Sequence, residues 1–220
     1  MCNWNDFMES IKSRVNTFIE TPEWIKEFVS IFWPTARFDW KKIKITDVTL
    51  REWDQAPLTS FSWIEKKFVY LMLRELWVNI IEVWFPAWDK DFKNIKNLVN
   101  FFSDDENPPF ISVLWRCVNH DTDKSIEVTK DIKNTRVHTF IATSEAHIID
   151  KFCKDKWRDL TEWKQFVIDS IIESVTKLKK EQDIRLKEWK QFEIEWSPED
   201  GTNTKYDFLL QATIKAIISW

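Results

Sequence analysis

Short apolar runs alternate with longer amphipathic stretches along the chain from residue 42 onward. The short runs are rich in valine, isoleucine and threonine, which is typical of buried strands. The predicted strands are residues 42–50, 78–83, 110–114, 136–142 and 191–196. Each run is followed by apolar residues spaced three or four apart, which predicts a helix.

The predicted helices begin with the one that opens at Ser62, where Ser62 and Glu65 form a capping-box pattern. The others cover residues 91–102, 121–133, 145–180 and 207–219. Strict alternation of strand and helix favours right-handed crossovers and a parallel sheet, either doubly wound or a (β/α)₈ barrel.

Polar residues gather just past the carboxyl ends of the predicted strands, where barrel active sites are built. No glycine-rich phosphate loop follows the first strand. We therefore predict an α/β fold, a partial (β/α)₈ TIM barrel of about five βα units over residues 42–220. Residues 1–41 read as a helical N-terminal extension, because residues 5–32 carry amphipathic helical spacing.

Tryptophan is abundant and glycine nearly absent: the chain has 15 tryptophans and one glycine, Gly201, where glycine normally makes up about 7% of residues. Trp77 and Trp220 end helical runs, where a left-handed glycine is usual. Trp53 and Trp88 lie in polar strings that predict turns. We hypothesise that the gene reads UGA as glycine and that its translation rendered this codon as tryptophan. The alternative is an aromatic binding surface or a membrane-interface belt.

The bulk composition is that of a soluble globular domain, with 44% hydrophobic and 31% charged residues and a net charge of −4. No apolar stretch is long enough to span a membrane, and the N-terminus has no signal-peptide core. Basic and acidic residues are interspersed, so we expect no nucleic-acid partner. Cys2, Cys117 and Cys153 lack metal-ligand spacing and suit a cytoplasmic protein, as small buried hydrophobic residues.

Four segments carry a specific pattern: DVTLREWDQAP (47–57), IIEVWFPA (80–87), RVHTFIATSEAHI (136–148) and EWSPED (195–200). Together they resemble the DRE-TIM metallolyase superfamily, which includes the 2-isopropylmalate, homocitrate and citramalate synthases. The resemblance covers roughly residues 43–220. Trp53, Trp77 and Trp84 fall where that family has glycine, whereas Trp196 falls where it often has an aromatic residue.

The resemblance implies condensation of the methyl carbon of acetyl-CoA with the ketone of a 2-oxo acid, assisted by a divalent metal (Zn, Mg or Mn). Glu52 matches the metal-binding carboxylate. Arg51 matches the arginine that stabilises charge developing on the oxo group. Gln55 is expected to orient the loop and the substrate. For Arg51 and Glu52 the alternative is an ion pair between neighbours at the surface.

His138 is expected to contact the 2-oxo acid, although a satisfied core histidine is the alternative. Thr143, with Ser144, lies at the mouth of the same strand and is a substrate-binding candidate. Ser197 and Glu199 match residues lining the site, with Glu199 in an acid–base or orienting role. His120 and His147 are expected to be surface or cap residues. Asp47 is either a carboxylate supporting the metal site or a strand-end cap.

The chain departs from the family pattern in two ways. The family completes its metal site with an H-x-H pair, and no such pair occurs here. Five of the eight units of a barrel are present. We therefore expect the N-terminal part of an enzyme that is inactive alone and has its last strand unpaired.

The leading function is that of a 2-isopropylmalate synthase in leucine biosynthesis, acting on acetyl-CoA and 3-methyl-2-oxobutanoate as a full-length homodimer. Homocitrate or citramalate synthase is the competing activity. A non-catalytic truncated gene product is the alternative from another class.

Overall fold

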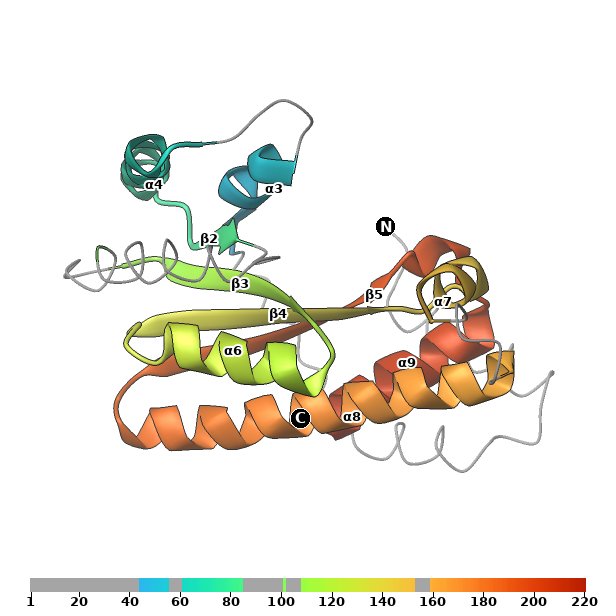
Figure 1. Cartoon of the computed structure of the whole chain (residues 1–220). Helices are drawn as coiled ribbons and strands as arrows, with labels where there is room; N and C mark the ends of the chain where they lie inside the picture. Colours follow the sequence, from blue (N-terminus) through green and yellow to red (C-terminus); the bar gives the residue numbers. More distant parts are fainter. Residues whose placement is uncertain (1–43, 56–60, 85–100, 102–107, 153–158) are drawn as a thin grey trace, which may run out of the picture. The chain divides into compact units, whose positions relative to one another are not determined.

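A computed structural model describes residues 44–55, 61–84, 101, 108–152 and 159–220 (Figure 1). The chain divides into two compact units, Met1–Lys41 and Lys42–Trp220. The helices expected in the first unit, the one expected at 91–102 apart from Phe101, and Cys2, Trp88 and Cys153 lie outside the described residues.

Five parallel strands form one sheet in the order β1-β2-β3-β4-β5. Their bounds are β1 Thr46–Asp47, β2 Ile80–Trp84, β3 Phe110–Arg116, β4 Asn134–Ala142 and β5 Gln191–Glu199. Sequential strands are neighbours throughout, as in a barrel, and no strand order reversal of the doubly wound kind occurs among them. The predicted α/β fold, a partial TIM barrel, is confirmed.

Helices follow the strands in the described part of the chain. They are α3 Thr49–Gln55, α4 Trp63–Glu75, α6 Asn119–Thr129, α7 Glu145–Phe152, α8 Leu160–Lys187 and α9 Tyr206–Ile218, with a short 3₁₀ turn η1 at Gly201–Asn203. In Figure 1, α6, α8 and α9 run along one side of β3, β4 and β5. Helix α4 begins with the predicted capping box of Ser62 and Glu65.

The first predicted strand, 42–50, is wrong in its second half. Only Thr46–Asp47 pairs as β1, and the chain turns directly into α3. Asp47 causes this change, because its carboxylate accepts hydrogen bonds from the Thr49 backbone N–H (2.9 Å) and hydroxyl (3.2 Å). Asp47 is thus a strand-end cap. Trp53, predicted in a turn, consequently lies within helix α3.

The single helix predicted over 145–180 is also wrong in its bounds. Helix α7 ends at Phe152, and α8 begins after Asp159, which caps it in a second capping box with Glu162. Helix α8 then continues to Lys187, beyond the predicted end. A run of polar residues around 180–187 weakens the apolar spacing and hides this last part.

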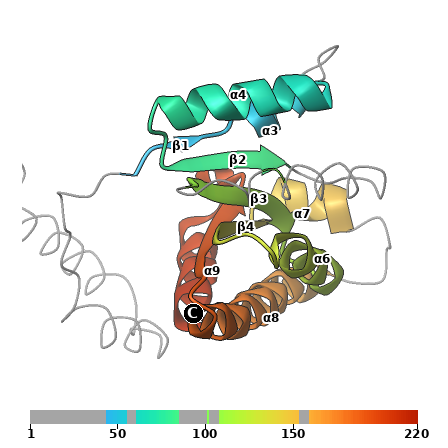
Figure 2. The same cartoon turned by 90° about the vertical axis from the view of Figure 1, so that its left-hand side faces the viewer.

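The sheet is curled into an arc. Adjacent strands lie about 4.8 Å apart, so in a flat sheet β2 and β4 would be separated by about 10 Å and β1 and β5 by about 19 Å. However, Glu82 of β2 bonds His138 of β4 directly, at 2.9 Å. Lys44, just before β1, forms an ion pair with Glu193 of β5. The Lys44–Glu193 contact requires a concave face, because these two side chains cannot span about 19 Å. Figure 2 shows α4 above β2, and α8 and α9 below β4.

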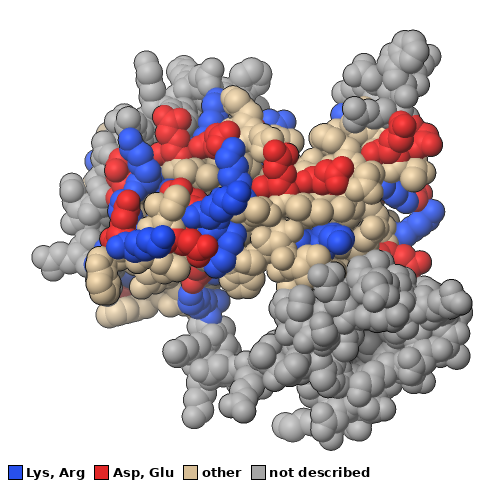
Figure 3. Space-filling view, turned by 90° about the horizontal axis from the view of Figure 1, so that it is seen from below, with Lys and Arg blue, Asp and Glu red and all other residues tan. Residues whose placement is uncertain are grey.

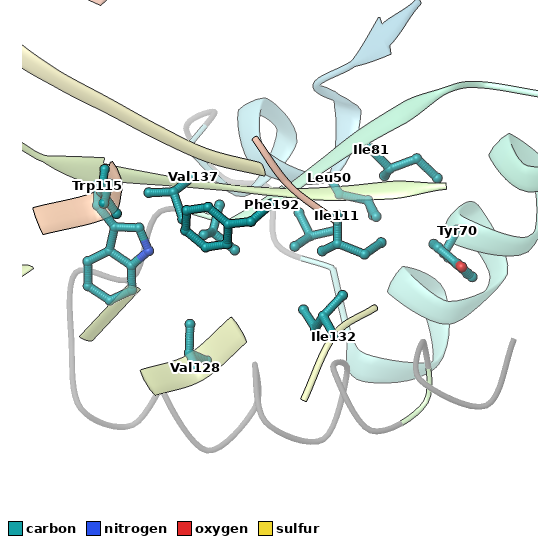
Figure 4. Packing of buried hydrophobic residues seen from close by; sticks show 12 residues of the cluster. Leu50, Tyr70, Ile81, Ile111, Trp115, Val128, Ile132, Val137 and Phe192 are labelled. Atoms are coloured by element: carbon teal, nitrogen blue, oxygen red, sulfur yellow. The ribbon is translucent and has the colours of Figure 1, made fainter. Parts of the chain in front are cut away.

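Alternate strand residues point to opposite faces of this arc. Val137, Ile111 and Phe192 belong to one hydrophobic cluster on the convex side, which α6 joins through Val128 (Figure 4). A second cluster packs β4, α8 and α9 around Ile171. The charged and polar residues of the concave side fall between these core positions, and they form the site.

Cys117 belongs to the second cluster and is fully buried. Burial raises the pKa of its thiol to about 12, against weaker opposing hydrogen bonds such as that with Thr139. The thiol is therefore protonated at neutral pH and acts as a small hydrophobic residue, as predicted. No helix in the described ranges is long and apolar enough to cross a membrane.

Candidate active site

Four side chains, from α3, β2, β4 and β5, meet on the concave face. Arg51 comes from α3, directly after β1, and its Nε donates to Glu82 of β2. The other Glu82 oxygen lies 2.9 Å from His138 Nδ1, on β4. The Nε2 atom of His138 is 2.7 Å from the hydroxyl of Ser197, on β5. The sheet thus joins residues far apart in sequence into one hydrogen-bonded row.

Glu82 is the centre of this row, with a side chain only 2% exposed. Besides Arg51 and His138, it accepts a 3.2 Å hydrogen bond from the Ser112 hydroxyl of β3. Burial alone would raise the pKa of Glu82, but the hydrogen bond and charge of His138, followed by those of Arg51, together hold it below its ordinary value. The carboxylate is therefore ionised at neutral pH.

Glu82 was not predicted from the sequence. Its signal is a charged residue inside the otherwise apolar strand Ile80–Trp84, because a buried charge must be paired. The resemblance included this segment, yet the prediction concentrated on residues after the strands. Glu82, by contrast, is the middle residue of strand β2 and does not follow it.

Arg51 also pairs with its neighbour Glu52, whose side chain is 55% exposed. The neighbour ion pair considered as an alternative is therefore present, but Arg51 has a second, buried partner in Glu82. A surface role alone does not account for that. Gln55 ends helix α3, and its side chain lies outside the described part of the structure.

Thr143 and Ser144 connect the loops after β4 and β5. The Thr143 hydroxyl donates to the Glu199 carbonyl (3.2 Å) and pairs with the Thr204 hydroxyl (2.7 Å). Ser144 donates to the carboxylate of Asp200 at 2.6 Å. Thr143 is only 1% exposed. The structure thus brings Thr143 to the strand mouth with its hydroxyl bonded to protein groups.

Glu199 ends β5 two residues after Ser197, on the same face of the strand. Its carboxylate pairs with Lys151 of α7 and lies 4.0 Å from His147 Nδ1. The backbone N–H of His147 donates to Ser144 at 3.3 Å, so His147 belongs to the start of α7, as predicted. His120 is exposed beside Asp121 and away from the row.

A metal ion would find one suitable ligand here. Glu52 offers an exposed carboxylate at the mouth of the arc. Within the described ranges, no three His, Cys, Asp or Glu side chains are arranged to hold a metal. Glu82 is engaged by Arg51, Ser112 and His138. The described residues therefore offer one carboxylate ligand for a divalent ion and not a complete set.

Charges on the face shown in Figure 3 are mixed, with Lys and Arg beside Asp and Glu.

Comparison with known proteins gives a family match that covers most of the chain. The model of the family described as HMGL-like matches residues 42–218, which includes the whole sheet and the four-residue row. The chain belongs to the HMGL-like family.

Several curated relatives of this HMGL-like chain are named 2-isopropylmalate synthase. That of Bradyrhizobium sp. (strain ORS 278) is 34% identical over 81% of the chain and 31% of its own length. That of Pyrococcus abyssi is 32% identical over 78% of the chain and 31% of its length. That of Lactococcus lactis subsp. lactis (strain IL1403) is 30% identical over 80% of the chain and 31% of its own length. The chain spans about a third of the length of these relatives.

Proposed function

We propose that the protein to which this chain belongs is an acyl-CoA:2-oxo acid C-acyltransferase that forms a carbon–carbon bond. The observation that carries the proposal is the row Arg51–Glu82–His138–Ser197, which gathers a cation, a buried carboxylate and an imidazole on the concave face of the parallel sheet. The names of the relatives support it.

The row favours one protonation pattern. The ionised carboxylate of Glu82 can only accept, so Nδ1 of His138 carries a proton. In the doubly protonated imidazole, Nε2 donates to the Ser197 oxygen. The Ser197 hydroxyl, held in a fixed orientation by His138, then has its proton free to donate to an oxygen of the 2-oxo acid. Glu82 acts through its neighbours as a positioning residue.

Arg51 supplies the positive charge for the substrate's oxo group. Its guanidinium is held by Glu82, so its position is fixed before the substrate arrives, which is the arrangement that stabilises developing charge best. A divalent ion (Zn, Mg or Mn), when bound with Glu52 among its ligands, polarises the ketone. Gln55 and Thr143 complete the proposed surroundings of the substrate.

Glu199 is the proposed acid–base group. It takes a proton from the methyl carbon of acetyl-CoA, that carbon bonds the ketone carbon, and the ketone oxygen receives a proton. Water then cleaves the thioester and releases CoA. The ion pair with Lys151 of α7 fixes the position of the Glu199 carboxylate.

Among substrates, we propose 3-methyl-2-oxobutanoate, which makes the enzyme a 2-isopropylmalate synthase of leucine biosynthesis. The relatives' names favour it over homocitrate or citramalate synthase. We further propose that the 220-residue chain is the N-terminal part of a cytoplasmic homodimer and is inactive by itself, since no H-x-H pair occurs in it.

The test uses the complete gene product. CoA release from acetyl-CoA should be fastest with 3-methyl-2-oxobutanoate, compared with 2-oxoglutarate and pyruvate, and should require a divalent metal. His138→Gln should reduce kcat/KM by about 10²-fold or more, whereas the exposed His120→Gln should leave it unchanged. Release that is absent with all three acids, or that survives Arg51→Met and His138→Gln, contradicts the proposal.

The second candidate is a truncated, non-catalytic product. It is favoured by the lack of a three-ligand metal site among the described residues. The reading frame beyond Trp220 decides between the two. An in-frame continuation that encodes an H-x-H pair supports the enzyme, and a stop codon directly after Trp220 supports the truncated product.

A further inference from the structure

Helix α4 ends in a Schellman motif whose left-handed residue is Trp77. The backbone N–H of Trp77 donates to the Arg74 carbonyl (3.0 Å), and that of Val78 donates to the Leu73 carbonyl (3.2 Å). Trp77 has a φ of 58°. This pair of bonds is the usual way to end a helix, and glycine is the usual residue at that position because it has no Cβ.

Helix α8 ends in the same motif, with Trp189 as its left-handed residue. Trp189 N–H donates to the Leu186 carbonyl (3.3 Å), and Lys190 N–H donates to the Arg185 carbonyl (3.0 Å). Its φ is 60°. Trp189 was not singled out from the sequence, because the apolar spacing fades before the end of α8. Two independent helices therefore place tryptophan where the backbone favours glycine.

The two rings gain little from being there. Trp77 is 83% exposed and Trp189 is 92% exposed, although a buried indole is one of the largest contributors to a core. The only other positive-φ residue among those described is Asp200, a type that tolerates this conformation. Tryptophan at these positions is unfavourable for two reasons: the Cβ strains the left-handed backbone, and the exposed ring gains no burial.

Trp77 also borders a surface hollow with Asn79, Phe110 and Asn134. Asn79, Phe110 and Asn134 lie at the amino ends of β2, β3 and β4, the end of the sheet opposite to Glu199, which ends β5. An aromatic binding surface at this hollow is the alternative use of the Trp77 ring. It does not account for Trp189, which ends a different helix.

We propose that the protein made in its own cell carries glycine at positions 77 and 189, because its gene encodes both with UGA read as glycine. The inference stands on backbone geometry together with the single glycine in 220 residues, and it does not depend on the proposed enzymatic function. A lack of CoA release would leave it untouched.

The same geometry separates these two positions from other tryptophans. Trp115 is only 3% exposed, within the first hydrophobic cluster. Trp53 lies in α3 and stacks on Phe61, with ring centroids 5.8 Å apart. Trp220, expected to end α9 with a left-handed backbone, does not have a positive φ. Glycine at position 53 or 84 therefore rests on the family resemblance alone.

The decisive experiment is mass spectrometry of the protein purified from its own organism. Cleavage before aspartate gives the peptide 183–199, which holds position 189 and, as an internal control, Trp196. Cleavage after lysine and arginine gives the peptide 75–90, which holds position 77. We expect fragment masses of glycine at 77 and 189. Tryptophan at either position overturns the proposal.

A second measurement uses the chain with the printed sequence. Trp77→Gly and Trp189→Gly should each raise the midpoint of thermal unfolding by about 2–4 °C. The matched controls are Trp53→Gly, in a helix with an ordinary backbone, and Trp115→Gly, in the core. Both should lower the midpoint, the latter by more. A lower midpoint for Trp77→Gly and Trp189→Gly would show that the rings stabilise the fold and would refute the inference.

Discussion

At the scale of single residues, the concave face is built around one buried charge. Glu82 contacts Arg51, Ser112 and His138, which come from α3, β3 and β4. Because each partner depends on the same carboxylate, removal of its charge affects the position of all three. The proposed site is thus a coupled unit.

Glu82→Gln tests this coupling. We expect the free energy of unfolding at pH 7 to fall by about 3 kcal/mol, because a buried charge network loses one partner. Glu52→Gln removes the exposed partner of the same arginine and should cost less than about 1 kcal/mol. Chemical denaturation of both variants measures the two costs. Equal costs would mean that Glu82 is not the centre of the network.

The difference in unfolding free energy between the wild type and Glu82→Gln should depend on pH. The pKa of Glu82 is lowered in the folded state, so its ionisation stabilises the fold above the pKa of an unfolded glutamate, about 4.3. This stability is lost as the pH falls through the lower, folded-state pKa. We therefore expect the difference between wild type and Glu82→Gln to be constant from pH 7 to about 5 and to shrink below it. A constant difference down to acid unfolding would contradict the assigned direction.

At the residue level, the sequence points to candidates both directly after a strand, as for Arg51, and within one, as for His138. Arg51 and His138 were found because their segments matched family motifs, and the structure brings them to one row with Ser197. Glu82 was missed, because its role depends on which strands become neighbours and how the sheet bends. Thr143 was placed correctly at the mouth, but its hydrogen bonds to Glu199 and Thr204 could not be read from the sequence.

At the scale of elements, the end of helix α6 is bonded by a side chain from helix α8. Arg185 of α8 is 2% exposed and donates to the carbonyls of Thr129 (2.7 Å) and Ile126 (2.8 Å), in the last turn of α6. It also lies over the ring of Phe192, 4.6 Å from its centroid. A cation at a helix C-terminus satisfies carbonyls that have no partner within the helix. Arg185 therefore links α6, α8 and β5.

Arg185→Met should destabilise the fold by about 3 kcal/mol, because buried carbonyls of α6 lose their donors while most of the side-chain volume is kept. Lys187→Met, in the exposed last turn of the same helix, is the matched control and should change the free energy of unfolding by less than about 0.5 kcal/mol. Amide hydrogen exchange should show the loss of protection first near the end of α6. If the two variants are equally stable, the cap makes no net contribution.

Elements as a class were predicted well, since β4 alternates buried and half-buried residues and α4 begins with a capping box. Their bounds were less predictable for physical reasons. Asp47 turns the chain into α3 by a local hydrogen bond, which competes with strand pairing and gives no periodic signal. Helix α8 ends in a Schellman motif at Trp189, and the apolar spacing that predicts a helix fades before that end.

At the scale of the whole described sheet, curvature is what creates the site. The alternation of strands and helices predicted the parallel order, but not the contacts across the concave face. Arg136 of β4 bonds both Glu193 (2.7 Å) and Glu195 (2.9 Å) of β5, and Lys44 reaches Glu193 from the other edge. This ionic group lies toward the amino ends of β4 and β5, and the row of Glu82 lies closer to the carboxyl ends of the strands.

A double-mutant cycle on Lys44 and Glu193 tests the curvature directly. In a flat sheet the two edge strands would be about 19 Å apart, beyond the combined reach of the two side chains, and Lys44→Met and Glu193→Gln would be additive. In the curled sheet we expect a coupling free energy of about 0.5 kcal/mol, small because Lys44 is 46% exposed, and weaker at high salt. The pair Lys44 and Glu181, which lies on α8 beside Arg185, should show none. Coupling in the control pair, or none between Lys44 and Glu193, would mean that β1 and β5 do not face each other, and the Glu82 row would then need another cause.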